Sequence, residues 1–276
     1  MLDVQAFSVA MCVYAGDDPL HFQKAVDSVI CQTVQPREIV IVVDGPVPER
    51  LNAFIQAYEH KELFHIIRLP ENLGHGEARR RGIESCRCEL IALMDADDVS
   101  VPVRFEKQLA AFAADSELAI VGGDISEFVG TEDCIVGYRR LPVRDDEIKQ
   151  YMRKRCPFNQ VTVMFRKEAV QQVGGYLDWY CEEDYYLWIR MYLAGMKFAN
   201  IPEVLVHVRV GREMYQRRGG LRYFKSEAKL QRYMRHHHII GVPTYVTNIV
   251  KRFIVQVLLP NRVRGWVFQK FARSNA

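Results

Sequence analysis

The sequence predicts an α/β protein, in which an open, mostly parallel sheet is covered by helices on both faces and a basic helical extension follows. Strongly apolar segments alternate with amphipathic ones up to about residue 114, a pattern typical of strand–helix–strand units. Acidic residues end several of the apolar segments. Charge divides the chain, because residues 206–276 contain 15 Lys and Arg against two acids, a net charge of +13, whereas residues 1–205 contain 22 against 32, a net charge of −10.

Composition indicates a globular protein of a reducing compartment. With 276 residues, 49% of them apolar, the chain is long enough to bury a substantial core. Seven scattered cysteines, an odd number, form neither a disulfide framework nor paired CxxC zinc motifs. The N-terminus lacks the pattern of a signal peptide, and no uninterrupted apolar run reaches the roughly 18 residues of a membrane span. We therefore expect a cytoplasmic protein, neither secreted nor integral.

The first part of the chain contains four apolar segments separated by helical patterns. The second segment is β-branched almost throughout, too apolar for a half-exposed strand, which favours a buried parallel strand. Apolar spacing and turn residues place the helices, the first of them beginning near Pro19. In order, the expected elements are strand 7–13, helix from 19, strand 38–43, helix 49–58, strand 64–69, a helix opened by 72–76, and a strand in the stretch 90–98.

The pattern becomes mixed after residue 100. Pro102 suits the first position of a helix that runs to about residue 114. Short strands are expected near residue 120 and at 125–129, 134–138 and 161–165, with a turn at 174–176. An amphipathic helix is expected over 183–194, with Asp184 in its first turn.

Acids gather where the predicted strands end. Asp44 ends the second strand, and Asp95 and Asp97 end the fourth, so all three belong to the edge of a parallel sheet where ligands bind. Neighbouring carboxylates raise one another's pKa and destabilise a fold unless a cation shares the site, so a metal–diphosphate site is predicted there. The alternatives are that Asp95 and Asp97 only form a helix cap and a turn, and that Asp44 is only a turn residue before Gly45.

Transfer of a sugar from a diphosphate would explain this distribution of acids. Negative charge grows on the departing diphosphate, and Mg²⁺ or Mn²⁺ held by Asp95 and Asp97 would stabilise it. The attacking hydroxyl must lose its proton on the opposite side of the sugar, which requires a separate carboxylate, and Asp184 is the candidate. The alternative for Asp184 is that it merely complements the dipole of its helix.

In combination, the motifs resemble the family 2 glycosyltransferases of the GT-A fold, a Rossmann-like mixed sheet flanked by helices. The resemblance covers roughly residues 7 to 220 and rests on their order along the chain. The motifs are Val13-Tyr14, Val43-Asp44-Gly45, Asn72-Leu73-Gly74, Met94-Asp95-Ala96-Asp97-Asp98 and Glu183-Asp184-Tyr185-Tyr186-Leu187-Trp188.

The resemblance implies a role for each matching residue. Asp44 and Tyr14 would bind the donor nucleotide, with Asp44 on uracil or ribose. Asp95 and Asp97 would contact ribose and a divalent metal, and Asp184 would be the catalytic base. Arg79 would lie near the base and the phosphates, although Arg79 to Arg81 could equally be a solvated helix face.

Three positions depart from the family pattern. Val43 stands where a second Asp is usual, Ala15 where Asn is frequent, and Tyr186 where Asp is frequent. The residues assigned to the metal and to the base are retained. The departures therefore bear on which substrate is used more than on whether the protein is active.

The basic part of the chain prompts two further expectations. His207, Arg209 and Arg212 could form a mobile loop over the diphosphate. We place the catalytic domain at residues 1–220 and a basic amphipathic tail at 221–276, which would lie on an anionic membrane at the inner face of the cell. The alternative is that the apolar side of the tail packs on the domain. The adjacent residues His236 to His238 point in different directions on a helix and indicate a solvated face rather than a metal site.

We therefore expect a metal-dependent, inverting glycosyltransferase. Its donor would be a nucleotide-diphosphate sugar, most simply a UDP-sugar, and its acceptor a glycan or lipid-linked glycan of a cell-surface polysaccharide. A nucleotidyltransferase is the first alternative, but its Gly-rich basic loop after the first strand is replaced here by an acidic turn, residues 14–18. A non-catalytic protein that binds anionic polymers is the second. No nucleic-acid partner is expected, because the body of the protein is acidic.

Overall fold

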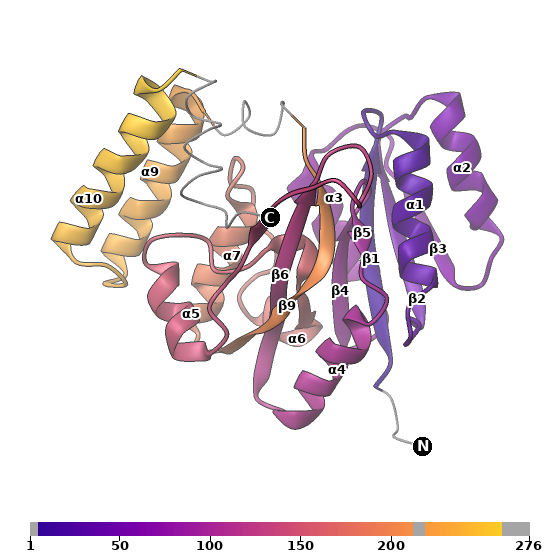
Figure 1. Cartoon of the computed structure of the whole chain (residues 1–276), viewed down its shortest axis with the longest axis horizontal. Helices are drawn as coiled ribbons and strands as arrows, with labels where there is room; N and C mark the ends of the chain where they lie inside the picture. The colour runs from indigo at the N-terminus through magenta and orange to yellow at the C-terminus, as the bar shows by residue number, and fades with distance from the viewer. Residues whose placement is uncertain (1–4, 212–218, 261–276) are drawn as a thin grey trace.

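The computed structural model describes residues 5–211 and 219–260, and in these residues the strands form a single sheet. The strand order is β3-β2-β1-β4-β8-β6-β9-β5, with β7 paired to β6 (Figure 1). The strands are β1 Phe7–Tyr14, β2 Glu38–Asp44, β3 Phe64–Arg68, β4 Leu90–Asp95, β5 Val99–Ser100, β6 Leu118–Phe128, β7 Ile135–Arg139, β8 Met164–Arg166 and β9 Lys197–Arg209.

The first half is the parallel α/β arrangement that the sequence predicts. Strands β1 to β4 are mutually parallel, and all seven residues of β2 are buried, as expected for a strand covered on both faces. The helices between them are α1 Pro19–Ile30, α2 Glu49–Glu59 and α3 His75–Ser85. Asp18 caps α1, since its Oδ1 accepts hydrogen bonds from the N–H groups of Leu20 and His21.

Register brings the acidic strand ends together. Tyr14 lies opposite Asp44 across β1 and β2, and Cys12 lies opposite Asp95 across β1 and β4. The expected convergence of Asp44 and Asp95 at one edge of the sheet is therefore present in the structure.

The second half is mixed, as expected, but three of its strands, β6, β8 and β9, differ from the prediction. The short strands expected near residue 120 and at 125–129 are one strand, β6, and β9 is a strand that the sequence pattern does not predict. The expected strand 161–165 is a 3₁₀ turn, Gln160–Thr162, followed by β8, and the helix expected from Pro102 begins two residues later. The helices here are α4 Arg104–Ala114, α5 Asp145–Met152, α6 Lys167–Gln172 and α7 Glu183–Leu193.

Close packing against neighbouring side chains explains the two glycines within β6. Gly122 and Gly123 interrupt its apolar pattern in the sequence, yet both are needed where β6 pairs with β9. A Cβ atom on Gly122 would collide with Asn200, and one on Gly123 would collide with Leu205. The sequence does not indicate strand β9, because Pro202 and the charged Glu203 interrupt its apolar pattern. The sheet accommodates these two residues by a shift in the register between β6 and β9.

Two cores lie on opposite faces of the sheet. Side chains of α1, α2 and α4 form the first core, and those of α3, α5, α6 and α7 contribute to the second (Figure 1). The last elements of the described residues are α9 Leu221–His236, α10 Val242–Phe253 and a π-helical turn, Ile254–Leu258. Leu230 and Met234 of α9 belong to the second core. Among the described residues, no helix combines the length and the apolar character needed to cross a membrane.

Candidate active site

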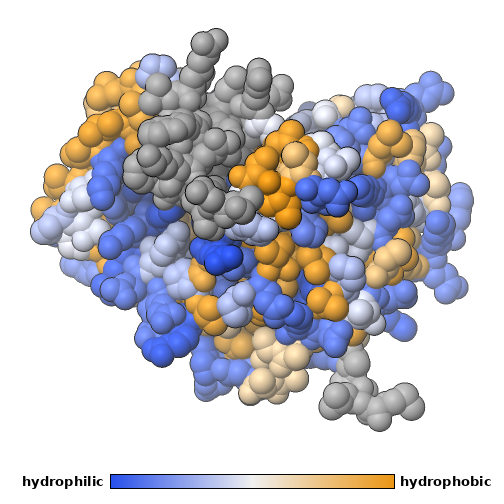
Figure 2. All heavy atoms as spheres, viewed as in Figure 1, coloured by the Kyte–Doolittle hydropathy of each residue, from blue (hydrophilic) through white to orange (hydrophobic). Residues whose placement is uncertain are grey.

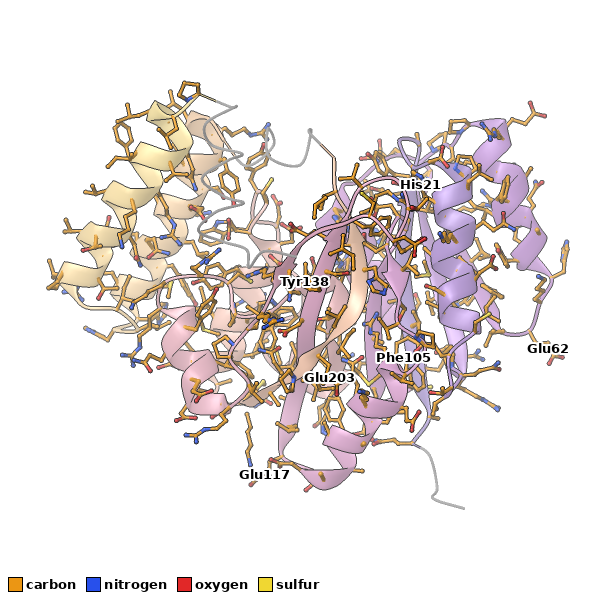
Figure 3. The ribbon with its side chains drawn as sticks, viewed as in Figure 1. His21, Glu62, Phe105, Glu117, Tyr138 and Glu203 are labelled. Carbon is orange, nitrogen blue, oxygen red and sulfur yellow. The ribbon has the colours of Figure 1, made fainter. Side chains whose placement is uncertain are left out.

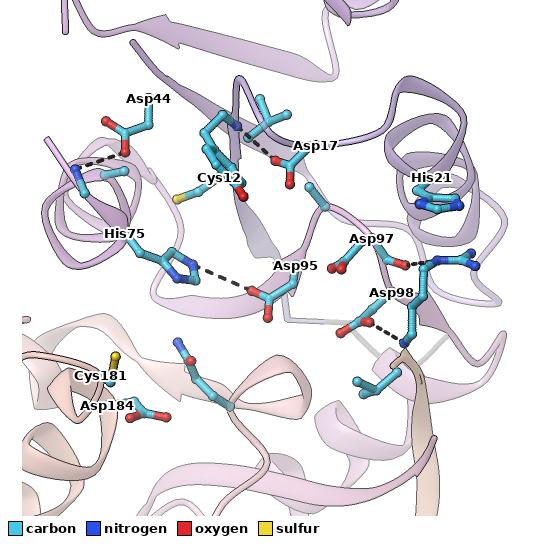
Figure 4. A pocket seen from close by; sticks show the side chains of 18 of the residues that line it. Cys12, Asp17, His21, Asp44, His75, Asp95, Asp97, Asp98, Cys181 and Asp184 are labelled. Atoms are coloured by element: carbon cyan, nitrogen blue, oxygen red, sulfur yellow. Dashed lines mark hydrogen bonds and ion pairs between the residues drawn. The ribbon is translucent and has the colours of Figure 1, made fainter. Parts of the chain in front are cut away.

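A pocket of about 920 Å³ opens at the carboxyl ends of β1, β2 and β4. Figure 3 shows His21, which lines it, at this edge of the sheet, with Glu117 at the opposite edge. Seven of its lining residues are acids, namely Asp17, Asp44, Asp95, Asp97, Asp98, Glu183 and Asp184, and Figure 4 labels all of them except Glu183. Loops at the carboxyl ends of parallel strands are the usual ligand site of open α/β sheets.

The end of β4 is supported from inside the protein by Arg104. This arginine is fully buried, and its Nη2 donates to the carbonyl of Leu93 at 2.8 Å while its Nε donates to Gln108 at 3.0 Å. Burial lowers the pKa of Arg104 to about 9, and the nearby carboxylates Asp95 and Asp98 oppose that shift. A positive charge is thus fixed beneath the acidic cluster.

Asp98 joins the cluster to the last strand of the sheet. Its Oδ1 accepts a hydrogen bond of 2.8 Å from the backbone N–H of Arg209 on β9. Burial, together with the charges of Asp97 and Asp95, holds the pKa of Asp98 well above its ordinary value.

The predicted mobile loop over the diphosphate is wrong for the two residues of it that the structure describes. His207 and Arg209 lie on β9, where sheet pairing fixes the backbone. The side chain of Arg209 donates to the carbonyls of Asp97 and Gly130, and it lines the pocket from this position. His207 is hydrogen-bonded to Ser126 through Nδ1. Arg212 lies outside the described residues.

Asp44 lines the pocket and also shapes the loop that precedes α3. Its Oδ1 accepts from the N–H of Leu73 at 2.7 Å, and its Oδ2 accepts from that of Gly74 at 3.1 Å. Asn72 in turn donates to the backbone carbonyl of Asp44. The Asn-Leu-Gly motif is thus held against the end of β2, and Gly74 adopts a φ of +88° that favours glycine.

Arg79 lies behind the pocket wall rather than on it. Its Nη2 donates to Asp95 Oδ1 at 2.9 Å and lies 2.7 Å from His75 Nε2. A guanidinium group only donates, so Nε2 of His75 is the acceptor. Arg79 is 3% exposed, which excludes the solvated-face alternative for this residue. It orients Asp95 toward the pocket.

The beginning of α7 forms the opposite wall. Asp184 and Glu183 both line the pocket from the first turn of the helix, and Figure 4 shows Asp184 across the cavity from Asp95. Glu182 is buried at the helix N-cap and accepts a hydrogen bond from Tyr223 of α9 at 2.9 Å. Burial and the adjacent charge of Asp184 raise the pKa of Glu183 to about 7.

Asp17 is a pocket residue that the sequence pattern does not reveal, because Gly16-Asp17-Asp18 indicates only a break before a helix. In the structure its Oδ2 accepts from the N–H of Tyr14, which turns the carboxylate into the pocket. Burial, and then repulsion from Asp97 and Asp95, raises the pKa of Asp17 to about 7.

Several other lining residues have no strong signal in the sequence. Cys181 precedes α7 with a φ of +57°, an uncommon conformation for a residue other than glycine. These lining residues are distant along the chain and come together at the pocket only in the folded protein. The lining side chains that sequence reasoning does not select include Cys12, Asp17, His21, His75, Gln160, Cys181, Glu183 and Tyr223.

The residues at the end of β4 fit a divalent metal bound together with substrate. Asp95 and Asp97 both line the pocket, and their negative charges add to burial in raising the pKa of their neighbour Asp98. Within the described ranges no three His, Cys, Asp or Glu side chains group closely enough to hold an ion by themselves. Mg²⁺ is ordinarily bound by one or two carboxylates with substrate phosphates and water completing the shell, which is the donor set available here.

Solved structures with the same architecture identify the fold. Staphylococcus aureus TarS, residues 1–349, superposes with a TM-score of 0.62 at 15% identity, over 96% of this chain and 74% of that one. Mannosyltransferase PcManGT from Pyrobaculum calidifontis, solved with GDP-Man and Mn²⁺, gives 0.60 at 16% identity, over 94% of this chain and 71% of that one. The fold is that of the GT-A glycosyltransferases.

Sequence comparison then gives the family. The family model "Glycosyl transferase family 2" matches residues 8–174. An uncharacterized glycosyltransferase of Haemophilus influenzae is 38% identical over 97% of this chain and 99% of its own length. The amylovoran biosynthesis glycosyltransferase AmsE of Erwinia amylovora is 38% identical over 82% of this chain and 84% of its own. The chain belongs to glycosyltransferase family 2, which confirms the resemblance and decides against both alternatives, the nucleotidyltransferase and the non-catalytic polymer-binding protein.

Proposed function

We propose that this glycosyltransferase moves a sugar from a nucleotide-diphosphate donor, a UDP-sugar, to a lipid-linked glycan, with metal dependence and inversion. The observation that carries the proposal is the division of acids between two facing walls. Asp95 and Asp97 lie at the end of β4, and Asp184 lies across the pocket on α7 (Figure 4). This arrangement leaves space between them for the sugar and its diphosphate.

The nucleotide side of the donor would occupy the end of β1 and β2. Tyr14 is 46% exposed beside Asp44, so its ring is available to a base or ribose. Asp95, oriented by Arg79, would contact the ribose or share the metal, and Asp97 would bind the metal. A bound Mn²⁺ or Mg²⁺ supplies electrostatic stabilisation of the departing diphosphate.

Asp184 would accept the proton of the acceptor hydroxyl. Its Oδ1 is also hydrogen-bonded to the N–H of Tyr185, which fixes the carboxylate at the start of α7. A single base facing the donor suffices for direct displacement at the anomeric carbon, in which the hydroxyl oxygen forms the new bond as the bond to the diphosphate breaks. Direct displacement inverts the configuration of that carbon.

The acceptor is inferred from relatives with named activities. An Escherichia coli relative, 33% identical over 98% of this chain and 98% of its own length, is a UDP-Gal:alpha-D-GlcNAc-diphosphoundecaprenol beta-1,3-galactosyltransferase. Together with the amylovoran enzyme, it supports a role in bacterial surface-polysaccharide assembly. We propose a glycan on a lipid diphosphate as acceptor, and a peripheral location at the inner face of the cell membrane.

The test is a panel of nucleotide sugars with Mn²⁺, assayed for hydrolysis and for transfer to a lipid-diphosphate N-acetylglucosamine. Asp97→Ala should abolish metal-dependent donor binding. Asp184→Asn should retain donor binding and slow transfer by roughly 10²–10⁴-fold, the usual contribution of a general base. Asp178→Asn is the matched control, because Asp178 is exposed near α7 and does not line the pocket. Normal turnover by both active-site variants would refute the assignment.

A further inference from the structure

Helix α10 presents its apolar side to solvent and its polar side to the protein. The exposed apolar residues recur every three or four positions along one side of the helix and its π-helical turn. They are Val242, Val246, Val250, Phe253, Ile254 and Leu258, which we call the α10 stripe. Figure 2 shows apolar side chains along the outer edge of this helix. Six of the sixteen large apolar side chains exposed in the described residues lie on this stripe, so it is a patch and not scattered exposure.

The inverted orientation is fixed by polar contacts beneath the helix. Asn248 is buried, and its Nδ2 donates to the carbonyl of Arg153 at 2.9 Å and to Gln231 at 2.8 Å. Arg252 forms an ion pair of 2.7 Å with Glu227, in which each side chain is 13% exposed. If α10 were rotated to bury its apolar side, the carbonyl of Arg153, the side chain of Gln231 and the carboxylate of Glu227 would lose these partners. The outward position of the α10 stripe is therefore part of the fold.

The stretch of chain that carries the α10 stripe is strongly basic. In residues 219–260 Glu227 is the only acid, and its charge is paired with Arg252. The same stretch contains six further Lys and Arg residues, and the sequence continues after it with Arg262, Arg264, Lys270 and Arg273 and no acid. An exposed apolar stripe in such a basic setting is the pattern of a helix that lies in the interface of an anionic bilayer.

We propose that the α10 stripe is a docking surface for an anionic lipid bilayer. A second copy of the chain is a poorer fit, because a two-fold contact through the stripe would bring the same uncompensated basic charges together. Anionic headgroups would instead neutralise them while the apolar side chains enter the acyl region. The proposal differs from the sequence-based expectation in naming one side of one helix, rather than the whole tail, as the contact.

The docking surface and the pocket are separated by a single helix. On α9, Tyr223 lines the pocket and donates to Glu182, while the ring of Phe224 packs on Phe253 of α10 at 5.3 Å. A bilayer against the stripe would therefore lie near the open pocket. If the proposed function holds, a lipid-linked acceptor could keep its lipid in the membrane while its glycan reaches Asp184.

The experiment is co-sedimentation of the full chain with vesicles of phosphatidylglycerol or of phosphatidylcholine. The wild-type protein should bind phosphatidylglycerol vesicles, weakly bind phosphatidylcholine vesicles, and lose binding as salt increases. Val246→Glu and, as a second variant, Val250→Glu should lower the partition coefficient by roughly tenfold or more, since each removes an apolar contact and adds a negative charge. Val136→Glu on β7 is the matched control, because Val136 is 42% exposed and Val246 50%, and it should bind like wild type.

Each alternative has its own result. Equal binding by Val246→Glu and wild type, or equal binding to both lipids, would overturn the proposal. A different result would assign the stripe to a second copy of the chain. In that case the wild-type protein would not bind vesicles, it would be a dimer in sedimentation equilibrium, and Val246→Glu would dissociate the dimer. Hydrolysis of soluble donor should be unchanged in Val246→Glu. Failure of the wild type to hydrolyse any donor would refute the proposed function and leave the docking result standing.

Discussion

The substitution Asp44→Asn tests whether the carboxylate at the end of β2 is a structural element. Two separate oxygens of Asp44 accept the N–H groups of Leu73 and Gly74, and the side chain is only 4% exposed. Asparagine offers one oxygen, so the other N–H would face an NH₂ group and lose its acceptor. A buried donor left without a partner costs about 1–3 kcal/mol. We expect Asp44→Asn to lower the free energy of unfolding by that amount.

Asp18→Asn is a closely matched control. Asp18 also accepts two backbone N–H groups, but both bonds go to the single oxygen Oδ1, at 2.8 and 3.2 Å. Asparagine retains that oxygen and caps helices about as well as aspartate, so the expected loss is under about 0.5 kcal/mol. Urea unfolding of both variants measures the difference. Equal losses would show that the two-oxygen arrangement at Asp44 contributes nothing particular to stability.

Five other substitutions give clear expectations. Asp98→Asn should cost little, since its amide oxygen can still accept from Arg209, whereas Asp98→Ala should cost about 1–3 kcal/mol in thermal or urea unfolding. Gly122→Ala should destabilise the protein by about 1–3 kcal/mol through collision with β9, while Gly76→Ala, whose new methyl group meets only ordinary contacts, should not. The free energy of unfolding should depend on pH through Glu183, whose pKa in the folded protein, about 7, is above the usual 4.5. The stability that Glu183 contributes is therefore full below about pH 4.5 and is lost as the pH rises to about 7. Glu183→Gln should flatten that fall, and an unchanged profile would contradict it.

The sequence is informative wherever local pattern and global fold coincide. In β1, β2 and β4 a buried parallel strand gives a continuous apolar run, and the acids that end the runs of β2 and β4 mark the edge of the sheet. The sequence alone therefore places Asp44, Asp95 and Asp97 at one edge. Asp184 is found through the resemblance, since an acid in the first turn of a helix has an ordinary explanation in the helix dipole.

The parts that the sequence does not predict depend on contacts distant along the chain. Strand β9 is defined by pairing with β6 and β5, and its own sequence, broken by Pro202, does not indicate a strand. Arg209 consequently resembles a loop residue in the sequence, although Asp97 and Asp98 fix it in the fold. Asp17 enters the pocket because its carboxylate caps the N–H of Tyr14, a turn geometry that has no distinct composition.

The tie between Asp98 and the N–H of Arg209 has a consequence for the order in which the protein can fold. The two residues are 111 positions apart, and β9 is inserted between β6 and β5 although it is the last strand along the described chain. During synthesis β1 to β4 can assemble before β9 is made, whereas the acidic wall of the pocket is completed only when β9 arrives. Contacts of such sequence separation form late and slowly. A ribosome-bound chain that ends before β9 should therefore have a native-like first half, in which Asp97 and Asp98 lack their contacts with Arg209.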